Sequence, residues 1–257
     1  MTGFFSRLLK SAFPVDEARV AGAPTSSNRA SSFHLNWEIQ RTPLSEVRAT
    51  IEVIEPPTVS MLYFWALQVS FVGPGGRIGG AHIGLQHHPS YPDACAVNWG
   101  GYRDGQGELE GSVSALPSAL NNINTRTCRW YPNRQYVLRV YRSPDQGWRG
   151  SVTDTSTGEE TVIRDLWVDA DHLASPVVWS EVFAHCDHAS AAVRWSGLTG
   201  IGLDGTTHDV RSVRLNYQTH QDGGCANTNT SVDQLGFVQR TAVERQSQTG
   251  QILTLPN

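Results

Sequence analysis

The chain has 257 residues, of which 39% are hydrophobic and 17% charged, with 24 glycines and 13 prolines. A chain of this length can bury roughly 70% of the surface that it exposes when unfolded, so we do not expect disorder over most of it. Its net charge of −4 offers no basic field for nucleic acid, and its longest apolar run, residues 61–67, is much shorter than the roughly 20 residues of a transmembrane helix.

The N-terminal segment predicts a short amphipathic helix. The apolar residues between Phe4 and Ala12 fall on one helical face, and Pro14 would end the helix. Their pattern lacks the continuous apolar stretch of a secretory signal, so residues 1–20 form either a disordered arm or a docking segment for a partner. Residues 21–32 are small and polar and read as a linker. We therefore expect three parts: residues 1–32, a folded domain over 33–245, and a C-terminal tail over 246–257.

Beyond Phe33 the apolar residues recur with a period of two, which predicts half-buried strands at 33–39 and 47–53. Residues 61–72 are apolar at nearly every position, which predicts a central strand covered on both faces. Loop residues 154–158 predict a hairpin. Further strands are predicted at 78–87, 94–99, 109–114, 134–142, 146–153, 160–168, 176–186, 191–195, 209–219 and 235–240.

About thirteen short strands, with turn residues between them and no amphipathic helix within the folded part, indicate an all-β protein. We expect two antiparallel sheets packed as a jelly-roll sandwich in a single domain. A second domain would need a linker in the middle of the chain, and the sequence contains none there.

Several segments resemble a family of uncharacterised bacterial proteins. They are residues 63–66 before a glycine-rich turn, 83–86, 136–141, 178–183, 222–229 and 236–239. The resemblance covers about residues 60–245. Such proteins are similar to the concanavalin-like lectins and glucanases, so the resemblance implies a sandwich that binds polysaccharide across a concave sheet. It implies no particular activity.

Four cysteines allow three pairings. Their order along the chain suggests that Cys95 pairs with Cys128 and Cys186 with Cys225; four reduced, buried thiols are the alternative. Disulfides would favour an oxidising compartment. Together with the resemblance, they favour an extracellular or cell-surface location, although no signal peptide is visible.

One predicted strand carries acid–base residues at alternate positions, so that their side chains would point to the same face of the sheet. Glu181, His185 and Asp187 would emerge on one sheet face, with Trp179 and Phe183 among them. This face would be chemically competent, but it lacks the closely spaced pair of carboxylates that glycosidases use. The alternatives are a Glu181 paired with Arg194 or Arg214, and a His185 hydrogen-bonded at a sheet edge.

A second candidate set lies on the strand at 78–87, where His82 and Gln86 share a face. With Arg139 and Tyr141 from another strand, they would neutralise a uronate and abstract the adjacent proton, as β-elimination requires. The alternative is structural: Gln86 would bridge backbone groups, and glycines would allow close packing of the sheet.

Aromatic residues carry the hypothesis of sugar binding, because a flat indole can stack on the apolar face of a sugar ring. Five of them lie in turn-like contexts and are predicted to contact a ligand: Trp99, Tyr102, Trp130, Tyr131 and Trp148. Four tryptophans on strand patterns are predicted to lie in the core instead: Trp37, Trp65, Trp167 and Trp179.

No cofactor is expected. Oxygen-bearing residues at 222–229 would suit a structural calcium ion, but turn chemistry explains the same composition. A zinc site built from His185, Cys186, His188 and Cys225 would compete with disulfide formation.

The sequence therefore favours a non-catalytic, lectin-like sandwich that binds a polysaccharide or other glycan. A polysaccharide hydrolase or lyase that uses the sheet-face residues is the second hypothesis. A structural or partner-binding protein docked through residues 1–20 is the third.

Overall fold

The computed structural model describes residues 18–40, 42–105, 107–145 and 147–256. Within these ranges the chain is all-β, as predicted, without an α-helix and with one short 3-10 turn, Pro92–Ala94. No helix among these residues has the length and apolar character needed to cross a bilayer. The helix or arm predicted at the N-terminus falls mostly on residues 1–17, outside the described residues.

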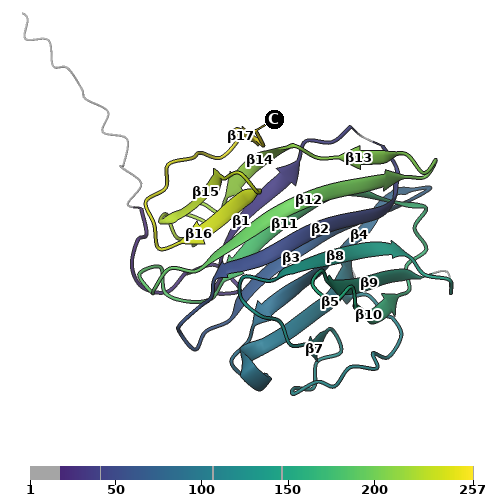
Figure 1. The fold of residues 1–257 in the computed structure, drawn as a ribbon, viewed down its shortest axis with the longest axis horizontal. Coiled ribbons are helices and arrows are strands. Elements are labelled where there is room, and N and C mark those ends of the chain that lie inside the picture. Colours follow the sequence, from purple (N-terminus) through teal and green to yellow (C-terminus); the bar gives the residue numbers. More distant parts are fainter. Residues whose placement is uncertain (1–17, 41, 106, 146, 257) are drawn as a thin grey trace, which may run out of the picture.

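The strands form two antiparallel layers (Figure 1). The first layer runs in the order β17 (Ile252–Thr254), β14 (Ser212–Tyr217), β1 (Ser31–Trp37), β11 (His172–Val182), β3 (Tyr63–Gly73), β4 (Gly76–His87) and β5 (Cys95–Arg103), with β6 (Gly107–Glu108) and β7 (Thr125–Thr127) at the edge. The second runs β15 (Thr228–Val232), β16 (Phe237–Thr241), β12 (Ala192–Gly202), β2 (Leu44–Glu55), β8 (Gln135–Arg142), β9 (Trp148–Asp154) and β10 (Glu160–Leu166), with β13 (Thr207–Asp209) on the far end of β12. A single pairing of Leu173 with Leu44 joins the layers.

Alternation along the strands builds the core between the layers. Val47, Ala49, Ile51 and Val53 of β2 point inward and are essentially inaccessible, while the residues between them face out. β3 is flanked by β11 and β4 and is buried on both faces over its first half, as predicted for a central strand. The hairpin predicted at 154–158 is also present, between β9 and β10.

The strand predictions are wrong at segments whose structure depends on hydrogen bonds to a neighbouring strand and not on an alternating apolar pattern. Residues 109–114 form only one isolated bridge, at Gly111. β15 has the polar sequence TNTSV and was not predicted, yet it pairs with β16 over its whole length. β17 lies within the predicted C-terminal tail and extends the first sheet beside β14.

The expected linker also differs from the structure, because residues 18–30 are tied to the domain by backbone hydrogen bonds. The amide of Ala226 donates to the Arg19 carbonyl at 2.7 Å, and the amide of Thr25 donates to the Gly223 carbonyl at 3.0 Å. β1 then begins at Ser31, two residues before the predicted start. We call residues 18–30 the N-terminal strap.

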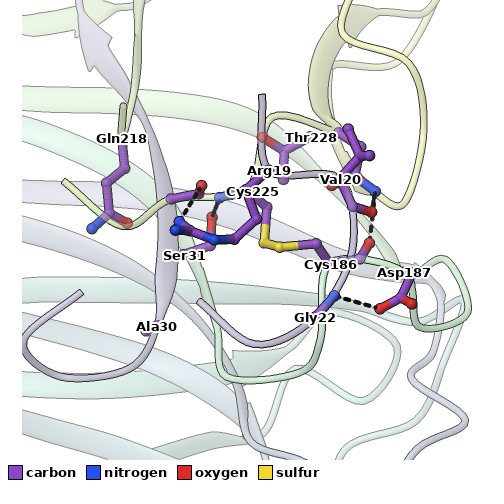
Figure 2. Close-up of a disulfide and its surroundings, with 12 residues drawn as sticks. Arg19, Val20, Gly22, Ala30, Ser31, Cys186, Asp187, Gln218, Cys225 and Thr228 are labelled. Carbon is purple, nitrogen blue, oxygen red and sulfur yellow. Dashed lines mark hydrogen bonds between the residues drawn. A yellow bond between two sulfur atoms is a disulfide. The ribbon is translucent and has the colours of Figure 1, made fainter. Parts of the chain in front are cut away.

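Cys186 and Cys225 form a disulfide, as predicted, beside this strap (Figure 2). The Cys186 amide donates to the Gly22 carbonyl at 2.8 Å, and the Gly22 amide donates to Asp187 at 3.0 Å. The predicted second bridge is wrong: Cys95 and Cys128 are free. The Cys95 thiol donates instead to the carbonyls of Asp93 and Trp130.

Removing this disulfide should lower stability markedly. The bridged residues are 39 apart in sequence, and a loop of that size corresponds to about 4 kcal/mol of chain entropy, or a fall in Tm on the order of 10 °C. We expect this fall for Cys186→Ala with Cys225→Ala in scanning calorimetry. Cys128→Ala serves as the control and should shift Tm by only a small fraction of that amount; equal falls would contradict the assignment.

Candidate functional site

The outer face of the first sheet, which points away from the second layer, carries a groove of about 230 Å³. Five adjacent strands supply its lining. These residues are Ser32 and His34 from β1, Trp179 and Glu181 from β11, Phe64 and Gln68 from β3, His82 from β4, and Tyr102 from β5. All belong to the outward parity of their strands, so strand pairing alone brings them together.

Aromatic rings form the floor of this groove. Phe64 and Trp179 meet edge to face with their centroids 4.9 Å apart, and the His82 ring contacts both of them, at 5.5 and 5.7 Å. The two positions between these residues are occupied by small residues. They are Ala66 of β3 and Gly84 of β4, which are paired in the register. The space that they leave allows the rings to pack together.

The histidines of the groove are uncharged at neutral pH. Burial lowers the pKa of His34 to about 4 and that of His82 to about 4, because desolvation penalises the charged imidazolium. The lining contains no lysine or arginine. Each neutral imidazole therefore offers one hydrogen-bond donor and one acceptor, in addition to those of Ser32, Gln68 and Tyr102.

Among the described residues that line the groove, Glu181 alone carries a carboxyl group. Burial raises its pKa above the usual value, although a hydrogen bond from the Asn28 amide to Oε1, at 2.8 Å, opposes that rise. The expected pairing with Arg194 or Arg214 does not occur. Arg194 instead binds Glu52 and Asp233, and Arg214 binds Glu38.

The prediction that Glu181, His185 and Asp187 share one strand face is wrong. β11 ends at Val182, so His185 and Asp187 lie in the loop that leads through the disulfide. There the His185 ring stacks on His188 at 4.7 Å, and Asp187 accepts the Gly22 amide. Only Glu181 of this set reaches the groove.

The four residues that were predicted to catalyse β-elimination do not lie together in the structure. His82 lines the groove, whereas Gln86 is buried and does not. Arg139 and Tyr141 lie on β8 in the other layer, where Arg139 binds Glu46 at 2.6 Å. The structure places Gln68 and Tyr102 beside His82 instead, since Gln68 is its direct partner in the β3–β4 register.

Three of the five aromatic residues predicted to be exposed are core residues. Trp99, Trp130 and Trp148 are 0%, 4% and 0% exposed. The glycine near Trp148 reflects close packing and not exposure, since a Cβ at Gly150 would lie 2.6 Å from the Trp99 indole. Tyr102 lines the groove, and Tyr131 is exposed elsewhere, between the guanidinium groups of Arg129 and Arg134.

The tryptophans assigned to the core divide differently. Trp37 and Trp65 are in the core between the layers, as predicted, and Trp179 is also buried, at 6% exposed, in a second cluster beneath the groove. Trp167 is 53% exposed, so its assignment to the core is wrong. His34, Phe64 and Gln68 were not predicted as site residues. The sequence pattern shows that these side chains point to the outer face of their strands. It does not show which strands are neighbours in the sheet.

No group of three or more histidine, cysteine or acidic residues within the described ranges is placed to hold a metal. The disulfide occupies both thiols of the zinc set that the sequence suggested. In the segment 222–229, Asp222 accepts the Thr219 hydroxyl at 2.6 Å, and the Asn227 amide donates to the Cys186 carbonyl. These contacts are turn chemistry.

No family model and no curated protein matches the chain. Among solved structures, similar chains include a scytalido-glutamic peptidase bound to a peptide-based transition-state analogue (TM-score 0.48, 11% identity) and SCP-B, an eqolisin-family peptidase bound to a tripeptide (0.46, 11%). Each match covers 84% of this chain and 99% of the other. The alginate lyase Aly36B matches 60% of this chain and 68% of its own (0.26, 11%).

Glu181→Gln should stabilise the protein more at pH 7 than at pH 4. The pKa of Glu181 is higher in the folded state than in the unfolded state, so its favourable contribution is present at low pH and is lost as the pH rises through the folded-state pKa. The gain in Tm on substitution should therefore be larger at pH 7 than at pH 4, because burial penalises only the ionised carboxylate. Calorimetry of both proteins at the two pH values measures this difference. A gain in Tm that is independent of pH would contradict it.

Proposed function

We propose that this protein binds a neutral glycan in the groove on the outer face of the first sheet. The observation that carries the proposal is the combination of an aromatic floor with a polar rim whose neighbouring cation, Arg77, is paired with Asp104. Phe64 and Trp179 provide the apolar surface, and Ser32, His34, Gln68, His82 and Tyr102 provide donors and acceptors. Ligand sites are commonly apolar surfaces with a few placed polar groups, and a sugar ring presents the matching combination of a C–H face and hydroxyls.

Charge favours a neutral ligand over an acidic one. A uronate or sulfated polymer would find no arginine or lysine among the described lining residues, and Arg77, which contacts Tyr102 beside them, already pairs with Asp104. The histidines of the lining are unprotonated near pH 7. It would also face Glu181, whose ionised form would repel it. A neutral glycan avoids both costs, because its hydroxyls need hydrogen bonds and no counterion.

The arrangement of the polar groups supports orientation of a ligand. The Trp179 indole N–H donates to Gln68 Oε1 at 3.2 Å, which fixes the amide and directs its NH₂ group elsewhere. Tyr102 Oη accepts a hydrogen bond from Arg77 at 3.1 Å, so the phenol can donate its own hydrogen to a ligand. Of the aromatic and sheet-face residues from which the sequence predicted sugar binding, Tyr102, His82 and Glu181 line this groove.

Gln68→Ala and Tyr102→Phe should each weaken glycan binding about 5–10-fold, because each removes one or more hydrogen bonds while the fold remains. Titration calorimetry against a panel of soluble β-glucan, xylan, galactomannan and polyuronate measures the affinities. Gln135→Ala, on β8 in the other layer, is the matched control and should leave the affinity unchanged. Failure to bind any neutral glycan, or a preference for the polyuronate, would refute the proposal.

A second candidate is acid-assisted hydrolysis of the bound glycan, favoured by the raised pKa of Glu181 in an accessible groove. The lining residues that the structure describes supply no second carboxyl for the two-carboxylate mechanism. Enzymatic release of reducing ends at pH 4–6 that is lost in Glu181→Gln would favour hydrolysis. Release of unsaturated ends that is lost in His82→Ala would favour elimination. Binding without either product would leave the non-catalytic function.

A further inference from the structure

Two arginines are buried without a carboxylate at the edge of the sandwich, and neither belongs to the groove lining. Arg126 lies on the edge strand β7 and is 7% exposed, and Arg164 lies on β10 and is 2% exposed. Neither forms an ion pair with any acidic residue of the described ranges. A guanidinium group stays protonated in proteins, so two positive charges are buried there.

Strand register directs both side chains toward the space between the layers. Arg126 pairs with Val97 of β5, whose side chain is in the core, and Arg164 pairs with Gly150 of β9, which lies against the Trp99 indole. Each shares the face of its partner, because paired residues point to the same side of a sheet. The two guanidinium groups lie close together, because both bond to the short segment 122–125. Burial lowers the pKa of Arg164, and the charge of Arg126 lowers it further.

The hydrogen bonds that these arginines form are to neutral acceptors. Arg164 Nη2 donates to Asn124 Oδ1 at 2.8 Å, and Arg126 Nη1 donates to the backbone carbonyls of Asn122 and Thr125. Arg126 Nε, Arg164 Nε and Arg164 Nη1 are buried and have no acceptor, and the indole nitrogen of Trp99 on the same inner face also lacks one. All of these unsatisfied groups are donors.

We propose that the Arg126–Arg164 pair is the binding site of a small anion such as phosphate, acetate or chloride. Water could satisfy the free N–H groups, but it would not compensate two buried like charges, whose isolation is strongly destabilising. A bound anion supplies both the acceptor atoms and the charge. Residues 111–124, which lead into β7, have no regular structure apart from the bridge of Gly111 to Leu166, and several of them are exposed. The proposal requires that an anion enter past this loop.

Glu108 is the acidic residue that raises the pKa of Arg164 through its charge, yet it does not bind either arginine. Its carboxylate accepts the Asn124 amide at 3.3 Å and remains exposed. If Glu108 turned inward in solution, it would fill the site itself. The protein would then show no saturable dependence on added anion, which would overturn the proposal.

The test is the Tm of the full chain in calorimetry, with chloride, acetate and phosphate titrated in turn against a bulky organic sulfonate at constant ionic strength. We expect a saturable rise of roughly 5–10 °C when the preferred anion reaches about 100 times its Kd. A rise that continues linearly in every arm would reflect general salt effects and would overturn the proposal.

Arg164→Met and, independently, Arg126→Met should abolish the saturable rise. Because each removes an uncompensated charge, each should be at least as stable as the wild type in anion-poor buffer. Arg149→Met is the matched control: Arg149, on the adjacent strand β9, binds Asp165 through two bonds of 2.8 Å. This variant should be less stable but keep the anion response. An unchanged response in both Arg126→Met and Arg164→Met would refute the site.

Discussion

The first sheet has two different faces, and most properties of this protein depend on that asymmetry. On β11, Val178, Ser180 and Val182 point into the sandwich, while Val177, Trp179 and Glu181 point out. The inner parity must be apolar and closely packed to hold the layers together. The outer parity is free of that requirement, so it can carry histidine, glutamine and carboxyl groups without disturbing the core. A slip of one residue in register would exchange the two sets.

The small residues of the outer face have a similar importance. An added Cβ at Gly84 would lie 2.0 Å from the Trp65 carbonyl oxygen, and its neighbour Ala66 across the strands is completely buried. Larger side chains at these two positions would separate the strands or push apart the rings of Phe64, His82 and Trp179. The groove therefore depends on the small residues Ala66 and Gly84 as much as on the groups that line it.

The sequence predicted the fold class, the central strand, one hairpin and one disulfide, because these follow from period-two patterning, glycine-containing turns and cysteine order. It placed Glu181 and His82 on outward faces correctly, but it extended the strand of Glu181 too far and so added His185 and Asp187. It interpreted Trp99, Trp130 and Trp148 as exposed because glycine and proline flank them. In a tight sandwich, glycines also mark positions where a neighbouring tryptophan occupies the space of a side chain, as Trp99 does at Gly150. Nothing in the sequence identifies which strands are neighbours, so the contact of β1, β11, β3, β4 and β5 was not predictable.

The strap connects the disulfide loop with the groove. Its Gly22 binds the loop of the disulfide, and its Asn28 donates to Glu181 in the groove. Asn28 stabilises the ionised carboxylate, while burial opposes ionisation, so the position of the strap sets part of the acidity of the groove. The disulfide anchors the segments on which the strap lies, because Cys186 and the neighbours of Cys225 form the backbone bonds that hold it. The disulfide thus holds together the segments against which the strap packs, and the strap places Asn28 within hydrogen-bond distance of Glu181.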